Sequence, residues 1–250
     1  MMLHTDSVSL SFGGVQAVRE VSLSVQAGEL LGLIGPNGAG KTTFLRLLTG
    51  ILAPDCGAIR FQDRDITRAP IHRRARLGMA MTHQIVRPFR EMSLIENVMI
   101  AAVPEITANP WRALVHVRRD RARARALGLL ERLGIADAAD RPAHTLPLGY
   151  LKRMQVARAL AFEPRLLLLD EPLAGLNYTE ATRLADLIVQ LNREGRTVVL
   201  VEHNIAEVVR IASRLAVLHN GALLAEGLPA AVMARADVRA AYLGKAGSDA

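Results

Sequence analysis

Apolar and polar residues alternate in the first part of the chain. Val8 to Phe12 and Val21 to Val25 place apolar residues at every second position, with Gly13 and Gly14 between the two runs. This period-two pattern around glycine predicts antiparallel strands that bury one face. Ala58 to Phe61 predicts a further strand of the same sheet.

A continuous apolar run comes next. Leu30 to Ile34 reads as a strand that is buried on both of its faces. A glycine-rich loop follows this run directly, and after the loop Phe44, Leu47, Leu48 and Ile51 recur at helical spacing. The order strand, glycine loop, helix is the local structure that a phosphate-binding loop requires.

The later part of the chain alternates between strand and helix patterns. Arg165 to Asp170 and Thr197 to Glu202 predict strands, and Glu180 to Glu194 predicts a helix between them. Two short apolar runs then flank Asn220-Gly221, which is a strong signal for a β-hairpin. These patterns predict a doubly wound α/β core with its ligand at the carboxyl ends of the strands.

The middle of the chain has another character. It is rich in alanine, leucine and arginine, and its pattern is mostly helical. The densest basic stretch lies within Arg112 to Gly134, and we interpret it as a solvated helix face, with contact to anionic lipid headgroups as the alternative. The α/β core is therefore predicted to be interrupted by a helical insertion.

Composition narrows the class of protein. Half of the residues are apolar, which permits a sizeable core, and the net charge of +7 comes almost wholly from arginine because the chain has only three lysines. No apolar run is long enough to cross a bilayer, and the N-terminal residues do not read as a signal peptide. The single cysteine, Cys56, permits no internal disulfide. We expect the protein to stay in the reducing compartment where it is made.

The glycine loop carries the clearest chemistry. It fits G-x-x-x-x-G-K-[ST] in full, as Gly35, Pro36, Asn37, Gly38, Ala39, Gly40, Lys41 and Thr42. The glycines let backbone N–H groups turn inward around a phosphate, and the following helix adds its positive end. Lys41 reaches the β and γ phosphates of a nucleotide, and Thr42 offers its hydroxyl to Mg²⁺. ATP and Mg²⁺ are the expected cofactors.

A second motif ends an apolar strand with two carboxylates. Leu166 to Leu169 is followed by Asp170 and Glu171. We expect Asp170 to hold Mg²⁺, directly or through water, and Glu171 to orient and deprotonate the attacking water. The two motifs together predict an NTPase, without saying which one.

Three further features are weak when each is taken alone. Gln84 lies where the core gives way to helices, and His203 follows a predicted strand. Residues 146–150 lead into a helix and read Leu146, Pro147, Leu148, Gly149 and Tyr150. Their order and spacing relative to the two strong motifs make them informative.

With these features the chain resembles the nucleotide-binding subunits of ABC transporters over nearly all of its length. The resemblance implies that Gln84 reaches Mg²⁺ and the attacking water, that His203 lies near the γ-phosphate, and that residues 174–177 form the D-loop. Catalysis would then rest on Glu171, His203, Gln84 and Lys41. The implied nucleotide-binding set is Phe12, Val18, Gly35, Pro36, Asn37, Gly38, Ala39, Gly40, Lys41, Thr42, Thr43, Gln84, Asp170 and His203, with Thr42, Gln84 and Asp170 on the metal.

In this set Phe12 would stack on the adenine ring and Val18 would pack beside it. A core position remains the alternative for Phe12. The implied fold class is α/β, a P-loop NTPase (RecA-like) core with an N-terminal antiparallel β subdomain and an inserted α-helical subdomain. Residues 1–250 then form a single ATPase domain, with the nucleotide-binding core in 1–87 and 164–250 and the helical signature subdomain in 88–163.

Several short segments are more specifically similar to the ATPases of branched-chain amino acid importers, in particular to the larger of that system's two ATPase subunits. They are Ser7 to Gly14, Arg90 to Asn97, the D-loop with Asn177, Val201 to Asn204, and Ala241 to Gly244. The resemblance implies a second ATPase subunit, two integral membrane permease subunits and an external solute-binding protein as partners, with no nucleic acid. It places the chain peripherally on the cytoplasmic face of the inner or plasma membrane.

One segment departs from the family pattern. The usual signature reads Leu-Ser-Gly-Gly-Gln, and in the family it touches the ATP bound to the partner subunit. Here the serine position holds Pro147, which has neither a hydroxyl nor a backbone N–H. Gly149 is retained at the predicted start of a helix, so backbone N–H groups remain available to a phosphate. The grip lent to the partner's ATP is expected to be weaker, which leaves both a homodimer and a mixed pair open.

Three alternatives remain at this point. The basic charge would suit a soluble ABC-type ATPase that acts on nucleic acid or ribosomes. A phosphate-loop kinase of small metabolites would need the arginines between Arg118 and Arg125 as a lid over the phosphates. An exporter ATPase for lipid or lipopolysaccharide resembles the same branch of the family, and the solute contacts of all such transporters lie on other chains.

Overall fold

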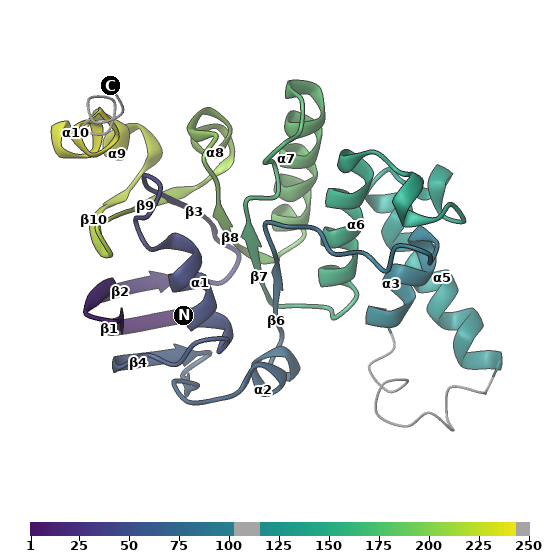
Figure 1. Ribbon diagram of the computed structural model, residues 1–250, viewed down its shortest axis with the longest axis horizontal. Helices are drawn as coiled ribbons and strands as arrows, with labels where there is room; N and C mark the ends of the chain where they lie inside the picture. The colour runs from purple at the N-terminus through teal and green to yellow at the C-terminus, as the bar shows by residue number, and fades with distance from the viewer. Residues whose placement is uncertain (103–115, 244–250) are drawn as a thin grey trace.

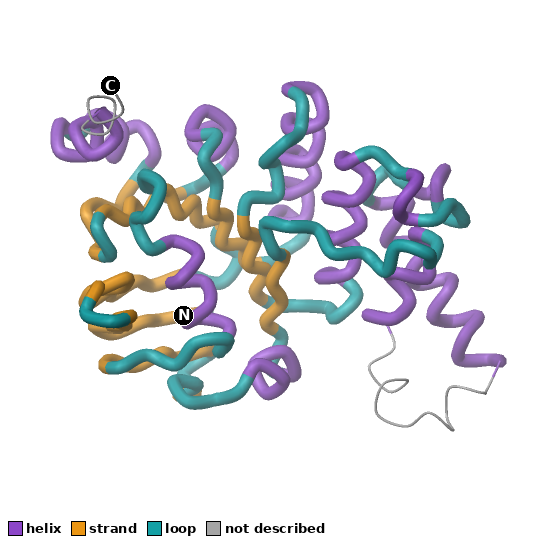
Figure 2. Tube along the Cα trace, viewed as in Figure 1, coloured by secondary structure: helices purple, strands orange, loops and turns teal. Residues whose placement is uncertain are grey.

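Two β-sheets and a group of helices make up the part of the chain that this computed structural model describes, residues 1–102 and 116–243 (Figure 1). An antiparallel sheet lies on one side of helix α1 (Lys41–Thr49) and a mostly parallel sheet lies on the other (Figures 1 and 2). The helices of residues 94–160 lie at the end of the molecule farthest from the N-terminal sheet. The predicted fold class is confirmed by this arrangement.

The antiparallel sheet carries the alternating segments. Its strands are β1 (Leu3–Phe12), β2 (Val15–Val25), β4 (Cys56–Phe61) and β5 (Arg64–Asp65), in the order β2-β1-β4-β5. Gly13 and Gly14 join β1 to β2 with φ angles of +52° and +87°, the left-handed values that a two-residue hairpin turn requires. The strands are longer than predicted because pairing begins at Leu3 in β1 and at Val15 in β2, before the alternating runs that start at Val8 and Val21.

The second sheet contains the continuous apolar runs. Its strands are β3 (Leu30–Ile34), β6 (Met79–Thr82), β7 (Leu166–Asp170), β8 (Thr197–Val201), β9 (Arg214–His219) and β10 (Ala222–Gly227), in the order β10-β9-β3-β8-β7-β6. All neighbours are parallel except β9 and β10, which form the hairpin predicted around Asn220-Gly221.

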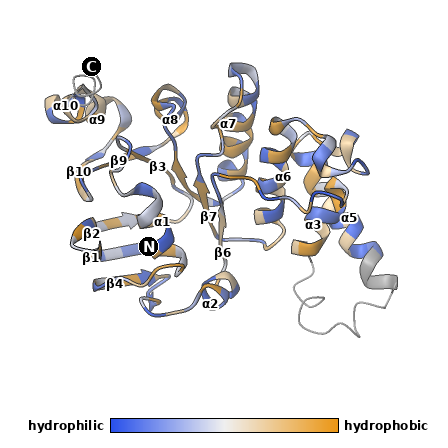
Figure 3. Cartoon of the chain, viewed as in Figure 1, coloured by the Kyte–Doolittle hydropathy of each residue, from blue (hydrophilic) through white to orange (hydrophobic). Residues whose placement is uncertain are grey.

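Both faces of the parallel strands are buried, which explains why their sequences do not alternate. Leu166 and Leu168 of β7 pack in the cluster that contains α1 and the antiparallel sheet. Leu167 and Leu169 pack in the other cluster, with the helices on the opposite face. Figure 3 shows the hydrophobic colour along these central strands. The carboxyl end of β7, where the paired acids lie, is therefore held by core packing on two sides.

Helix α1 is stabilised at its end by a buried cation. The helix ends at Gly50, whose φ is +77°, so Ile51 lies beyond the helix and is 40% exposed, and its predicted place on the apolar face is wrong. Arg74, in α2 (Ile71–Arg76), donates to the carbonyl oxygens of Leu47 and Leu48 at this end of α1. Burial lowers the pKa of Arg74 to about 10. A positive charge at a helix C-terminus is stabilising, so Arg74 helps to hold the helix that begins with Lys41.

The region between β6 and β7 is helical where it is described. It contains α3 (Leu94–Ala102), α5 (His116–Arg132) and α6 (Leu148–Leu160), with 3-10 turns at Ala136–Ala138 and Ala143–Thr145. Exposed arginines of α5 pair with acids, Arg123 with Asp140 and Arg125 with Glu163. These pairs support the interpretation of a solvated helix face. Arg112 and the side chains of Arg118 and Arg119 lie outside the described residues.

The remaining helices cover the second face of the parallel sheet and the C-terminal end. They are α7 (Tyr178–Arg193), α8 (Ile205–Ile211), α9 (Pro229–Ala234) and α10 (Ala236–Leu243). Asn177 begins α7 with a capping box, in which its side chain and that of Glu180 each accept a bond from the other's backbone N–H. Gly244 lies outside the described residues. None of the helices within 1–102 and 116–243 is long and apolar enough to cross a bilayer.

Candidate active site

The phosphate loop connects β3 to α1, and two of its glycines are required by close backbone contacts. Gly35 has a φ of +151°, and a Cβ there would lie 2.1 Å from the carbonyl oxygen of Leu218. Gly40 has a φ of +97°, and a Cβ there would lie 2.3 Å from the carbonyl oxygen of Ala17. A side chain at either position would clash with the main chain. The loop can therefore follow this path only with glycine at both places.

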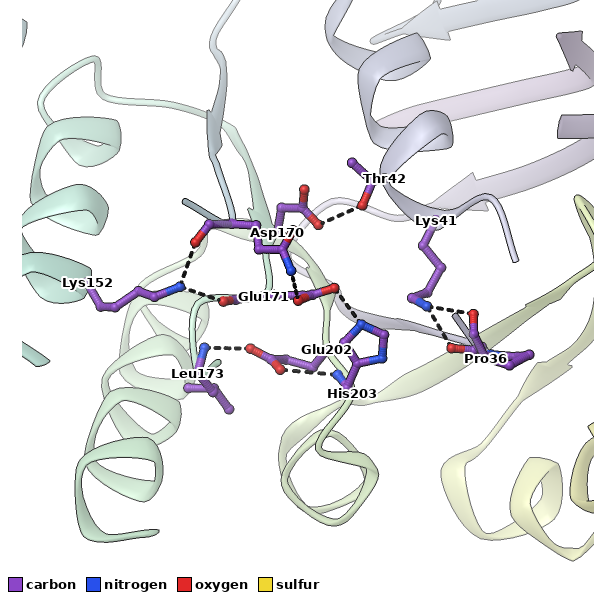
Figure 4. Close-up of polar contacts among 11 residues, drawn as sticks. Pro36, Lys41, Thr42, Lys152, Asp170, Glu171, Leu173, Glu202 and His203 are labelled. Atoms are coloured by element: carbon purple, nitrogen blue, oxygen red, sulfur yellow. Dashed lines mark hydrogen bonds and ion pairs between the residues drawn. The ribbon is translucent and has the colours of Figure 1, made fainter. Parts of the chain in front are cut away.

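Lys41 lies at the first turn of α1 with its ammonium group turned back on the loop. Its Nζ donates to the carbonyl oxygens of Gly35, at 2.7 Å, and of Pro36, at 3.1 Å (Figure 4). The side chain is 5% exposed. The loop thus encloses a positive charge next to the N-terminus of a helix, and both features attract an anion such as phosphate.

Thr42 and Asp170 bring two oxygen atoms together from distant parts of the sequence. Thr42 Oγ1 lies 3.4 Å from Asp170 Oδ1, at the carboxyl end of β7. Burial raises the pKa of Asp170, and the neighbouring charge of Glu171 raises it further. A hydroxyl and a carboxylate are hard oxygen donors that fit Mg²⁺, which takes few protein ligands when phosphates and water supply the rest. A cation at this point would also offset the repulsion between the two acids.

Glu171 occupies a strained backbone position at the end of β7. Its φ of +49° lies in the left-handed region, which non-glycine residues seldom adopt. Its N–H donates to the carbonyl oxygen of Val201 at 2.9 Å, which ties this turn to the end of β8. The residue is 6% exposed, so the carboxylate is held inside the protein.

The two carboxylate oxygens of Glu171 contact two of the other predicted catalytic residues. Gln84 Nε2 donates to Oε2 at 2.5 Å, and His203 Nε2 lies 2.5 Å from Oε1. Gln84 follows β6 and His203 follows β8, so the side chains come from the ends of the strands on either side of β7. Figure 4 shows His203 and Glu171 turned toward each other, with Lys41 on the opposite side of His203. The predicted set is therefore gathered at one edge of the sheet.

Two functional candidates were not found from the sequence. Glu202 is 2% exposed and accepts backbone N–H bonds from Leu173, at 2.6 Å, and from His203, at 3.2 Å. It thereby ties the segment after Glu171 to the segment that carries His203. Lys152 is 3% exposed and donates to main-chain oxygens beside the same site. The available signal for Glu202 was its position directly after the apolar run from Thr197 to Val201, whereas Lys152 stands beside Arg153 and offered none.

The pKa of Glu202 should make stability depend on pH. The pKa of Glu202 is raised from 4.5 to about 7, first by burial and then by the charge of Glu171, while the two N–H bonds and Lys152 partly oppose the rise. Between these values the unfolded chain loses the proton while the folded chain keeps it, so stability falls as the pH rises. The loss is about 3 kcal/mol over the full range.

Thermal unfolding of the wild type and of Glu202→Gln at about pH 5 and about pH 8 measures this effect. Other groups titrate equally in both chains, so their contribution cancels. We expect the wild type to lose stability relative to the variant at the higher pH. Equal pH dependence of the two chains would show that Glu202 titrates normally.

The two residues expected at the adenine ring differ in exposure. Phe12 is 50% exposed at the end of β1, so the core alternative for this residue is wrong and its ring is accessible. Val18 is fully buried and belongs to the core cluster around α1. The alternation of β2 directs its side chain inward, and this burial argues against the predicted contact between Val18 and adenine.

The altered signature segment begins α6 as predicted. Pro147 is the N-cap residue and provides no side-chain hydrogen bond. Gly149 packs closely on α7, since a Cβ there would lie 2.7 Å from Glu180 Oε1. The Tyr150 hydroxyl donates to Asp137 Oδ2 at 2.7 Å, so this side chain is held within the helical region. The segment can offer a phosphate the backbone groups of a helix start, without the serine hydroxyl.

Comparison with known families finds two matches. The sequence pattern of the family described as ABC transporter covers residues 18–174. The pattern described as branched-chain amino acid ATP-binding cassette transporter covers residues 222–248. The first match includes the phosphate loop and the paired acids, and the second covers β10 and the C-terminal helices.

Named relatives and solved structures agree with these matches over nearly the whole chain. The high-affinity branched-chain amino acid transport ATP-binding protein LivG of Salmonella typhimurium is 39% identical over 98% of both chains. The lipopolysaccharide export system ATP-binding protein LptB of Acidithiobacillus ferridurans is 37% identical over 97% of both. The crystal structure of the ADP conformation of an ATP-binding cassette of an ABC transporter has a TM-score of 0.87 at 29% identity, and the match covers 98% of this chain and 99% of that one.

Proposed function

The chain belongs to the ABC transporter family as an ATP-hydrolysing cassette, and we propose that it drives the import of branched-chain or other apolar amino acids. The match of residues 222–248 to the branched-chain amino acid pattern carries the choice of solute. The LivG relative, whose name states such transport, supports the same choice. Family membership removes the metabolite kinase as an alternative, because these cassettes transfer the γ-phosphoryl group of ATP to water and not to a metabolite.

In the proposed reaction the loop from Gly35 to Thr43 holds the phosphates of ATP. Lys41 contacts the β and γ phosphates, Phe12 stacks on adenine, and Thr42 and Asp170 hold Mg²⁺, which neutralises phosphate charge when bound. The 3.4 Å approach of the Thr42 and Asp170 oxygens supports this pairing. Backbone N–H groups of the loop and the start of α1 supply further positive potential.

Hydrolysis in this proposal depends on Glu171. Its carboxylate takes a proton from a water molecule as the water oxygen bonds to the γ-phosphorus, and the bond from that phosphorus to the β–γ bridging oxygen breaks. Gln84 orients the water and reaches the metal, and His203 contacts the γ-phosphate. The 2.5 Å contacts of Gln84 and His203 with Glu171 support a shared site for these three side chains.

The proposed working unit contains more than this chain. The segment from Leu146 to Tyr150 faces the ATP of a second ATPase subunit, and closure of the pair is transmitted to two permease subunits at the cytoplasmic face of the membrane. An external binding protein delivers the solute. Because Pro147 lacks the serine hydroxyl, this chain grips its partner's ATP less strongly than a signature with serine at this position would.

Transport in reconstituted vesicles tests this function. The chain is co-purified with its permease subunits, and uptake of labelled leucine is measured with and without ATP and binding protein. We expect uptake to require all components and to stop with Lys41→Ala. The LptB relative favours export of a lipid as the second candidate. ATP-dependent extraction of lipopolysaccharide, with no amino acid uptake, would favour that function over ours.

A further inference from the structure

Lys152 forms a buried connection between two parts of the active site. Its Nζ donates to the carbonyl oxygen of Gln84 at 2.9 Å and to the carbonyl oxygen of Glu171 at 2.9 Å. The side chain of Gln84 in turn donates to the carboxylate of Glu171 at 2.5 Å. The two residues are thus joined through their backbones as well as their side chains. Figure 4 shows Lys152 reaching Glu171 from the side away from Lys41.

A lysine at this position is costly for the fold. The residue is 3% exposed, and burial lowers its pKa, while the charges of Glu202, Glu171 and Asp170 act in the opposite direction. An apolar side chain of similar volume would avoid the desolvation of an ammonium group. Arg153, the other buried cation of α6, bonds main-chain oxygens of Leu133, Gly134 and Gly149 within the helical region, whereas Lys152 bonds main-chain oxygens of the active site. This placement of Lys152 indicates a role in arranging the groups that it bonds.

Two other side chains of α6 also bond the segment that follows β6, but they do not reach Glu171. Gln155 Nε2 donates to the carbonyl oxygen of His83 at 2.7 Å, and Arg158 donates to that of Arg87 at 3.2 Å. With Lys152 they form a row spaced by three residues along one side of the helix. Only Lys152 in this row also reaches the backbone of Glu171. The row fastens α6 to the segment around Gln84, and Lys152 extends that attachment to the predicted base.

From this geometry we propose that Lys152 is a positioning residue that couples the movement of α6 to the orientation of Glu171. Helix α6 begins at the signature segment, so a shift of that segment against the partner's ATP moves the Lys152 side chain. The two carbonyl oxygens then move together, and the Glu171 carboxylate is turned toward or away from the attacking water. The inference rests on the proposed role of Glu171 as the base.

The test compares Lys152→Met with Gln155→Leu in the full-length chain. Methionine keeps most of the volume and removes both hydrogen bonds, whereas Gln155→Leu removes an attachment of the same helix to the same segment without touching Glu171. We expect Lys152→Met to lower kcat by about tenfold or more, because small displacements of a reacting group have effects of this size. The Kd for MgATP should stay within about threefold, and Gln155→Leu should keep kcat within about twofold.

A double variant shows whether the effect passes through Glu171. In the Glu171→Gln background, adding Lys152→Met should not lower the residual rate of ATP hydrolysis any further, when that slow rate is measured over hours. Loss by the same factor in both backgrounds would overturn the coupling. So would a wild-type kcat in Lys152→Met, or an equal fall in Gln155→Leu.

Folding and the base assignment are checked separately. If circular dichroism shows that Lys152→Met is unfolded, the same measurements on Lys152→Gln decide the matter, since its shorter neutral side chain cannot span both carbonyl oxygens. A wild-type rate for Glu171→Gln alone would remove the proposed base. That result is distinct from failure of the Lys152 coupling, which appears in the Lys152 variants while Glu171→Gln remains inactive.

Discussion

Replacing Glu171 with glutamine should lower steady-state ATP hydrolysis by about 1,000-fold while ATP remains bound. The amide cannot accept the proton of the attacking water, and general-base catalysis contributes effects of this order. The shape of the side chain and its contacts with Gln84 and His203 are largely preserved, so binding is retained. Phosphate release measures the rate, and labelled ATP retained after gel filtration measures the trapped nucleotide.

Glu163→Gln is a matched control for this variant. Glu163 also has a left-handed backbone, with a φ of +48°, but its side chain is exposed and pairs with Arg125 far from the phosphate loop. Its hydrolysis rate should stay within about twofold of the wild type, because an exposed ion pair contributes little. Rapid hydrolysis by Glu171→Gln would show that another group is the base.

Replacing Lys41 with alanine should raise the Kd for MgATP by about 100-fold. Charge-assisted hydrogen bonds contribute about 1.5–3 kcal/mol each, and no other described lysine or arginine donates to the carbonyl oxygens of the phosphate loop. Titration calorimetry or a fluorescent ATP analogue measures the affinity, and circular dichroism checks the fold. ATP-driven uptake should fall with binding.

Arg123→Ala removes the same unit of positive charge at a distant place. Arg123 is exposed on α5 and pairs with Asp140, so its loss should leave the Kd for MgATP within about twofold. This comparison separates the local contact of Lys41 from the general attraction of a basic protein for nucleotide. Unchanged affinity in Lys41→Ala would place the nucleotide elsewhere and remove the basis of the transport assignment.

The chemistry of individual segments was readable from the sequence because it depends on neighbours along the chain. The glycine loop must follow a buried strand and open a helix, and Gly35 to Thr42 carries all the required residue types in order. Strands β3, β7 and β8 were likewise predictable, since burial on both faces produces uninterrupted apolar runs such as Leu166 to Leu169, whereas β6 was not predicted. The family resemblance placed Gln84, Glu171 and His203 at one site, and the shared edge at which parallel strands end is the physical reason that they meet.

The burial of individual side chains, and the contacts between segments that are distant in sequence, could be learned only from the folded chain. A period-two or helical pattern shows which face of an element is apolar, but it does not show how far a side chain lies from solvent. The family resemblance placed Val18 beside the adenine although it is buried in the core, and the helical pattern placed Ile51 on a helix that ends at Gly50. Lys152 and Glu202 were given no role from the sequence.

The sequence by itself determined the phosphate loop and the two acids at the carboxyl end of β7, because each depends on residues that are close along the chain. The tertiary structure decided which charged side chains are buried and which main-chain groups they bond. Lys152 bonds the backbones of Gln84 and Glu171 only because α6 packs between segments 68 and 19 residues away from it in the chain. Such packing is a property of the whole fold, and no local pattern encodes it.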